Sequence, residues 1–176
     1  MILDTDRLIL RELTLEDAPF ILELVNEPSW LRFIGDRGVR DLDGARAYLQ
    51  KGPLVMYASH GFGLYRVERK EDGTLMGMCG LIKREGLPHA DIGFAFFPRF
   101  WGQGYAREAA SAVLSHSRTK LGLEHVLAIV DPDNQSSIKL LETLGFRFQR
   151  MVRMPGATAD IRLYELHQPQ QGPQAS

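Results

Sequence analysis

Short apolar runs separated by turn residues predict a strand and two helices in the first third of the chain. The segment Leu3 to Leu13 carries Leu8-Ile9-Leu10 between charged residues and predicts a strand. Thr14 to Asp17 resembles a capping box, and apolar residues then recur at helical spacing until Pro28, which we expect to end the helix. A second helix is predicted from Ala45 to Lys51.

Polar and turn residues bound this second helix and the two strands that follow it. Asp43 is the expected N-terminal cap, and Gly52-Pro53 is the expected stop. Gly63 to Arg69 and Thr74 to Ile82 predict two strands, because the Asp72-Gly73 pair between them is a strong hairpin signal.

The second half of the chain alternates strands and helices before it ends in two strands. A glycine-containing loop follows a predicted strand, Asp91 to Phe97, and opens a long helical pattern, Tyr105 to Leu121. The remaining predicted elements are a strand over Val126 to Val130, a helix between Asn134 and Gly145, and strands over Phe146 to Met154 and Ile161 to His167.

The predicted order is β-α-α-β-β-β-α-β-α-β-β. It indicates an α/β (α+β) fold, in which helices flank a mixed, mostly antiparallel central sheet. We expect residues 1–167 to form one domain. Residues 168–176 are rich in Pro, Gln and Gly and are expected to form a disordered tail.

Composition narrows the class of protein without naming a function. The chain has 176 residues and a formal net charge of −1, so charge alone favours neither a nucleic-acid nor a membrane surface. One cysteine, Cys79, cannot form an internal disulfide, which favours a reducing compartment. No signal-peptide or membrane-spanning pattern is visible, so we expect a cytoplasmic protein.

The loop Trp101-Gly102-Gln103-Gly104-Tyr105-Ala106 is typical of an anion-binding site. It leads from a strand into a helix N-terminus, where main-chain N–H groups lack internal partners and the helix dipole adds positive charge. Glycines there allow close approach and positive φ angles. A dinucleotide fingerprint is excluded because Arg107 occupies its third glycine position, and no Gly-Lys-Ser/Thr follows.

This loop resembles the pyrophosphate-binding loop of the GNAT superfamily of acyl-CoA N-acyltransferases, Gln/Arg-x-x-Gly-x-Gly/Ala. Trp101 replaces the usual first residue, whereas Gly104 and Ala106 match. Asn134 to Phe146 resembles the second signature of the family, Asn-x-x-Ser/Ala followed by an apolar helix and Leu-Gly-Phe. Arg7 to Arg11 resembles the opening of the RimJ/RimL branch of ribosomal-protein N-acetyltransferases.

The resemblance implies a site for acetyl-CoA. It implies that the strand segment Phe94, Ala95 and Phe96 binds the pantetheine arm through backbone amides. The loop residues Trp101, Gly102, Gln103, Gly104, Tyr105 and Ala106 would surround the pyrophosphate, and Asn134 would bond the arm from the other side.

Two residues are candidates for catalysis. The resemblance implies that Ser137 donates to the leaving thiolate, because the Tyr that many relatives use is replaced here by Leu141. Ser137 could equally act only in capping its helix. A base must take a proton from the amine. Asp91 is our candidate, acting through water, although a salt-bridged structural carboxylate is the alternative. Glu12 and Glu85 are weaker candidates.

No metal and no covalent intermediate are expected. Cys79 lies in an apolar strand and is interpreted as a core residue, so transfer should be direct. The histidines show no paired ligand spacing: His60, His89, His116, His125 and His167.

The resemblance therefore implies an acetyl-CoA-dependent N-acetyltransferase. The implied acceptor is a primary amine, either a protein N-terminus or a small molecule, and a homodimer is left open. Its pocket is expected between the N-terminal helices and the last strands, with Trp30, Phe33, Arg37 and Arg40 as candidates that core packing or solvation explains as well. The alternative is an acyl-CoA-binding regulatory module without turnover.

Overall fold

A single eight-stranded sheet organises the protein, in the order β1-β2-β3-β4-β5-β6-β8-β7. It is seen in a computed structural model that describes residues 2–169. Neighbouring strands are antiparallel except β5 and β6, which are parallel. The strands are β1 (Ile2–Asp4), β2 (Leu8–Glu12), β3 (Leu64–Arg69), β4 (Leu75–Ile82), β5 (Asp91–Phe96), β6 (His125–Val130), β7 (Arg147–Val152) and β8 (Ile161–His167). The predicted mixed, mostly antiparallel fold is confirmed.

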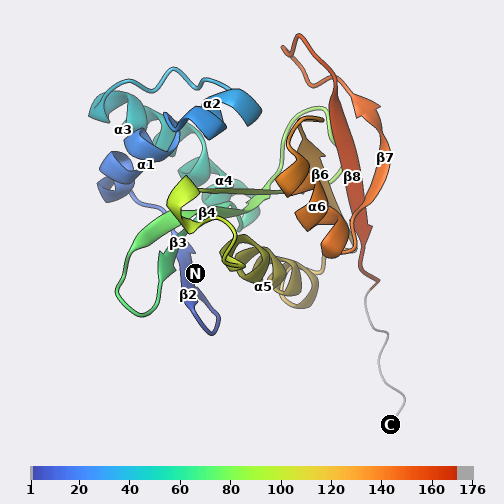
Figure 1. Cartoon of the computed structure of the whole chain (residues 1–176), viewed down its shortest axis with the longest axis horizontal. Coiled ribbons are helices and arrows are strands. Elements are labelled where there is room, and N and C mark those ends of the chain that lie inside the picture. The colour runs from blue at the N-terminus through green and yellow to red at the C-terminus, as the bar shows by residue number, and fades with distance from the viewer. Residues whose placement is uncertain (1, 170–176) are drawn as a thin grey trace.

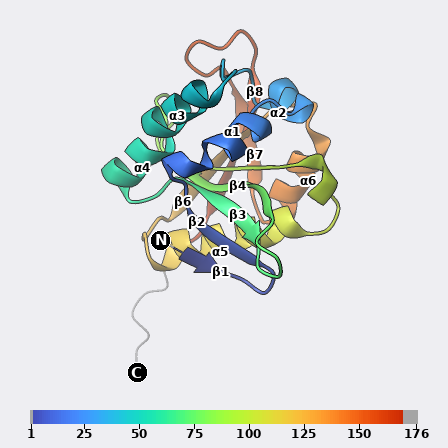
Figure 2. The same cartoon turned by 90° about the vertical axis from the view of Figure 1, so that its left-hand side faces the viewer.

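Helices cover both faces of this sheet. Helices α1, α2 and α3 lie on one side of strands β2 to β5, and α5 lies on the other side (Figures 1 and 2). Their bounds are α1 (Ala18–Leu24), α2 (Pro28–Phe33), α3 (Leu42–Lys51), α4 (Pro53–His60), α5 (Tyr105–Thr119) and α6 (Gln135–Thr143). Short 3₁₀ turns precede α1 at Leu15–Asp17 and α5 at Pro98–Phe100.

Two prolines that were expected to end helices instead begin the helices that follow. Pro28 and Pro53 each occupy the first position of a helix, α2 and α4. A proline is tolerated there because the N–H that it lacks would have no partner in that turn. Gly52 ends α3 as expected, but the chain then turns directly into α4 instead of leaving the helical region.

Two other boundaries also differ from the prediction. The expected first strand is a hairpin, β1 and β2, with Leu3 opposite Leu10. The cap of α3 is Asp41 and not Asp43, because the Asp41 carboxylate accepts a hydrogen bond of 2.7 Å from the Gly44 N–H. The tail is tied down at its start, where the Gln168 side-chain amide donates to Ser117 Oγ at 2.8 Å; the other tail residues beyond Pro169 lie outside the described residues.

One large apolar core joins the sheet to both helical layers. Its fully buried members include Leu8 and Leu10 on β2, Ile21 on α1 and Ala109 on α5. Complete burial of a leucine or isoleucine side chain contributes about 1.5–3 kcal/mol to folding. Within residues 2–169, no helix is long and apolar enough to cross a membrane.

The feature that positions the site is the split between the two parallel strands. Asp91 opposite Leu127 is the one register pair that joins β5 to β6. β4 pairs with β5 along its whole length, from Ile82–Asp91 to Gly77–Phe96. The side of β5 that faces β6 is therefore unpaired after its first residues.

Candidate cofactor-binding and catalytic site

The unpaired edge of β5 presents the backbone groups of alternate residues. The Phe97 N–H donates to Met76 O in line with β4, whereas Ala90 O accepts from the Leu127 N–H of β6. Because N–H and C=O groups alternate sides along a strand, the backbone groups of Phe94 and Phe96 face the split. An extended ligand could add to this edge as a further strand.

Ala95 has the opposite orientation from its two neighbours. It lies opposite Met78 of β4, in the same alternation as Phe97. Its backbone amide therefore points toward β4, and the expectation that this amide faces a ligand is corrected. Only its small, half-buried side chain is left to adjoin the site.

Trp101 links the end of β5 to the glycine loop. Its indole N–H donates to Phe96 O at 2.9 Å. The Trp101 side chain is otherwise 53 % exposed, so burial does not hold it in place. The hydrogen bond instead fixes the direction in which the chain leaves the strand.

The loop ends in glycine conformations that other residues rarely adopt. Gly102 has φ +74° and Gly104 has φ +82°. Gly104 is the N-cap of α5 and has no side chain with which to cap the helix. Because the first N–H groups of a helix lack internal acceptors, the amides from Tyr105 and Ala106 onward are available to an anion.

Arg7 supports this loop from the β1–β2 turn. Its Nη1 donates to Gln103 O at 3.1 Å, and its Nε forms an ion pair of 2.7 Å with Glu108. The guanidinium lies 4.3 Å from the centre of the buried Tyr105 ring. Glu108 is thereby neutralised in the first turn of α5, where its charge would oppose a bound anion. Sequence analysis assigned no role to Arg7 beyond its place in the opening motif.

The second signature lies at the same end of the sheet, because β5 and β6 are parallel. Asn134 is the N-cap of α6, and its Oδ1 accepts from the Ser137 N–H at 3.3 Å. Asn134 therefore caps the helix as well as matching the signature. Among the described residues, neither Asn134 Nδ2 nor Ser137 Oγ has a hydrogen-bond partner. Ser137 contributes its backbone to the cap and keeps its half-buried hydroxyl available.

Asp91 is buried at the closed end of the split. Its Oδ1 forms an ion pair of 2.8 Å with Arg84 Nε, and its side chain is 1 % exposed. Its Oδ2 is buried without a partner in the described part of the chain. Burial raises the pKa of the Asp91 carboxyl above its ordinary value, although Arg84 opposes the shift. Asp91 is thus a salt-bridged carboxylate, as the structural alternative expected. It also keeps one oxygen that has no partner in the described part of the chain.

Arg84 also belongs to a second group of residues, which sequence analysis did not connect with Asp91. The group consists of Arg37, Tyr48 and Arg84. Burial raises the pKa of the Tyr48 hydroxyl, and the nearby charges of Arg37 and Arg84 oppose that shift. The charge of Arg84, the partner of Asp91, therefore reaches Tyr48 on α3. Of the expected acceptor residues, Arg37 belongs to this group.

The other expected residues have different surroundings. Trp30 is buried in the core, and Phe33 lies beneath Arg32. Arg40 forms an ion pair with Asp36. Glu85 is exposed in the loop before β5.

Cys79 is fully buried in β4, as expected for a core residue. Burial raises the pKa of its thiol well above the ordinary value. The thiolate that a covalent mechanism needs is therefore disfavoured at this position.

Comparison with known proteins identifies a common domain. Residues 7–147 match the family described as the acetyltransferase (GNAT) domain. The uncharacterized N-acetyltransferase YoaA of Bacillus subtilis (strain 168) is 29 % identical over 175 residues, covering 97 % of this chain and 98 % of YoaA. The spermidine N(1)-acetyltransferase of Escherichia coli (strain K12) is 25 % identical over 138 residues, which are 78 % of this chain and 71 % of that protein.

A solved structure shares the whole fold. RimL, a ribosomal L7/L12 alpha-N-protein acetyltransferase crystallised with coenzyme A, superposes with a TM-score of 0.81. The match covers 96 % of this chain and 98 % of RimL at 19 % sequence identity. At this identity the similarity is one of fold.

Proposed function

The chain belongs to the GNAT acetyltransferase family, and we propose that it transfers the acetyl group of acetyl-CoA directly to a primary amine. The observation that carries the proposal is the continuity between the unpaired edge of β5 and the helix N-terminus that follows it. The edge suits an amide-containing pantetheine arm, and the uncapped amides of α5 suit a pyrophosphate. A single extended molecule with both features fits acetyl-CoA.

Catalysis in this proposal uses groups on both sides of the split. The neutral amine attacks the thioester carbon, so that a C–N bond forms as the C–S bond breaks. A backbone N–H near Phe96 stabilises the developing oxyanion. The Ser137 hydroxyl, which has no partner among the described residues, gives its proton to the departing thiolate and regains one from solvent water, so that CoA leaves as the thiol. The proton from the amine passes through water to Asp91, which has a buried, unpartnered oxygen.

The acceptor is proposed to bind on the side of the sheet that carries α3. The charges of Arg37 and Arg84 act on the Tyr48 hydroxyl of α3, and Arg84 also forms the ion pair with Asp91. The relatives include an enzyme for spermidine and one for a ribosomal-protein N-terminus. Both acceptors are primary amines, which supports that class.

The test is a thiol-release assay with acetyl-CoA and a panel of amines. The panel holds spermidine, free amino acids and peptides that begin with serine or alanine. Release that depends on one of these amines, with the acetylated product identified by mass spectrometry, is the expected result. Tight CoA binding without release for any amine would favour the regulatory module instead.

A further inference from the structure

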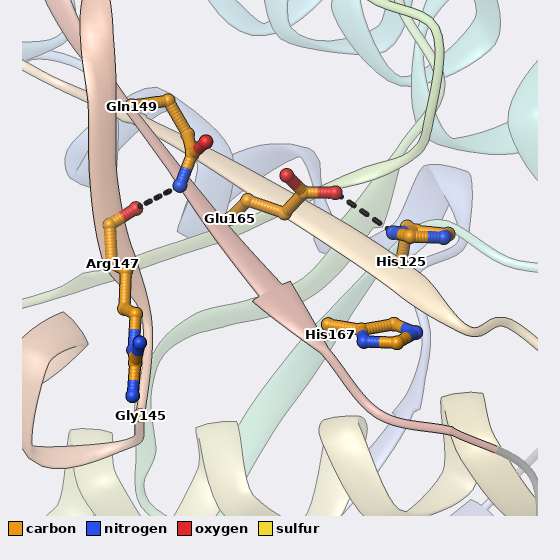
Figure 3. A pocket seen from close by; sticks show the side chains of 6 residues that line it. All are labelled: His125, Gly145, Arg147, Gln149, Glu165 and His167. Carbon is orange, nitrogen blue, oxygen red and sulfur yellow. Dashed lines mark hydrogen bonds and ion pairs between the residues drawn. The ribbon is translucent and has the colours of Figure 1, made fainter.

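Three of the five histidines come together at the closed end of the split, where β5 joins β6. His89 lies just before β5, His125 begins β6 and His167 ends β8. The rings of His89 and His125 stack with centroids 4.8 Å apart, and those of His125 and His167 with centroids 4.7 Å apart. Register explains the second contact, because His125 and His167 are cross-strand partners. Figure 3 shows these two rings one above the other.

A carboxylate completes the cluster. Glu165 lies on β8 two residues before His167, so both side chains project from the same face of the sheet. Its Oε1 lies 2.8 Å from His125 Nδ1, as the dashed line in Figure 3 marks. One donor atom each from His89, His125 and Glu165 lies within 4.8 Å of the other two. Side-chain rotations would bring these atoms to the ~2.0–2.2 Å that a Zn²⁺ ion requires of nitrogen and oxygen ligands.

We propose that His89, His125 and Glu165 bind a divalent transition-metal ion of the Zn²⁺ type. Two imidazoles with a carboxylate suit Zn²⁺, whereas Ca²⁺ and Mg²⁺ prefer oxygen ligands throughout. Three protein ligands leave a fourth position for water. That position is accessible, because His125 and Glu165 also line an open pocket of about 500 Å³.

A second set of donors shares His125. Glu124, His125 and His167 also have donor atoms within 4.8 Å of one another. Glu124 and His167 are exposed, whereas His89 and Glu165 are both half-buried. Less exposed side chains lose less freedom when they bind, so the first set is favoured.

The position of the cluster gives the ion a structural consequence. β5 and β6 are joined by one register pair, Asp91 with Leu127, and by the bond from Leu127 N–H to Ala90 O. His89 adjoins this joint on the β5 side, and His125 and Glu165 adjoin it on the β6–β8 side. A bound ion would cross-link the two halves of the sheet at the closed end of the split.

The cluster also explains why the sequence predicted no metal. The three histidines are far apart along the chain and lack the short spacing of helical or loop metal motifs. Only the pairing of β5, β6 and β8 brings them together. The proposal replaces that sequence-based expectation.

The experiment is a Zn²⁺ titration of the full chain after removal of any affinity tag and dialysis against a chelator. Competition with a chromogenic chelator measures affinity, and thermal unfolding measures the effect on stability. We expect one equivalent of saturable binding and a Tm that rises with Zn²⁺, because the ion binds the folded state. Absence of saturable binding below millimolar Zn²⁺ would overturn the proposal.

Variants distinguish the two donor sets. His89→Ala and Glu165→Gln should each weaken Zn²⁺ binding by at least about tenfold, given that even an outer partner of a ligand is worth about 10–100-fold. His60→Ala is the matched control, since His60 on α4 contacts the Phe62 ring outside the cluster, and this variant should bind Zn²⁺ as the unmodified protein does. Unchanged affinity in His89→Ala, with loss in His167→Ala, would contradict the assignment and place the ion on the second set.

Discussion

The indole N–H of Trp101 donates to the main-chain oxygen of Phe96 across 2.9 Å, and this bond joins the open strand edge to the glycine loop. Phe96 O is one of the backbone groups that face the split. Trp101 stands at the position where the family loop usually has Gln or Arg. The Trp101 side chain therefore contributes a structural restraint, because its hydrogen bond fixes where the loop begins relative to β5.

Trp101→Phe keeps an aromatic ring and removes this one donor. We expect CoA affinity to fall about two- to tenfold, because a net hydrogen bond is worth roughly 0.5–1.5 kcal/mol. Calorimetric titration with CoA measures the change. Trp30→Phe is the control, since Trp30 Nε1 has no partner among the described residues and its loss should leave CoA affinity unchanged. Equal affinities in both variants would contradict the role of Trp101.

Gly104→Ala places a β-carbon on a residue with φ +82°. This conformation costs a non-glycine residue about 1–2 kcal/mol, and relief of the strain would move the amides at the start of α5. We expect lower stability together with at least about tenfold weaker CoA binding. Gly61→Ala is matched, because Gly61 has φ +73° and open space around it. Gly61→Ala should lower stability without changing CoA affinity. A loss of CoA affinity in Gly61→Ala similar to that in Gly104→Ala would count against the site.

Ser137→Ala removes the hydroxyl proposed to protonate the thiolate. We expect kcat to fall by about 100-fold or more, the usual range for a general acid, while the KM for acetyl-CoA changes little. The α6 cap should survive, because Asn134 accepts from the Ser137 backbone. Ser136→Ala is the control, since Ser136 is exposed on the same turn. If both variants keep full kcat, Ser137 is not the acid.

Asp91→Asn tests the burial of the Asp91 carboxyl through the pH dependence of protein stability. The pKa of Asp91 is raised above 3.8 in the folded protein, so the folded state binds the proton more tightly than the unfolded state. The stability that Asp91 contributes is therefore complete below about pH 4 and is lost as the pH rises through its folded pKa. The free energy of unfolding of the unmodified protein, relative to Asp91→Asn, should fall as the pH rises from about 4 to 7.

Asp72→Asn provides a comparison of opposite sign. A side-chain hydrogen bond from Arg69 lowers the pKa of Asp72 below 3.8. Its contribution is present above that value and is lost as the pH falls through the folded pKa. Chemical denaturation at several pH values provides the measurement. The free energy of unfolding of the unmodified protein, relative to Asp72→Asn, should not decline between pH 4 and 7. Parallel curves for the two variants would refute the burial argument.

The proposed donor side of the site could be predicted from the sequence because its motifs are local. Gly102 and Gly104 lie in one loop, and Asn134 begins the next signature, so each motif is contiguous along the chain. The strand that precedes the loop was placed to within one residue, Asp91 to Phe97 against Asp91–Phe96. These features depend on strand and helix patterns that neighbouring residues determine.

What the sequence did not show depends on contacts between distant segments. The ion pair of Arg84 with Asp91 and the stacking of His89 on His125 require the sheet to be assembled. The helix α4 was missed for a different reason. Pro53 is as compatible with the first turn of a new helix as with the end of an old one, and local pattern does not separate the two.

The central claim is that the edge of β5 and the start of α5 together bind the extended CoA molecule. The most direct measurement compares the dissociation constants of CoA and of pantetheine, which lacks the pyrophosphate. We predict that CoA binds at least about tenfold more tightly, because charge-assisted bonds to the α5 amides are lost with pantetheine, and that Gly104→Ala removes most of this difference. Equal affinity for the two ligands in the unmodified protein would contradict the account.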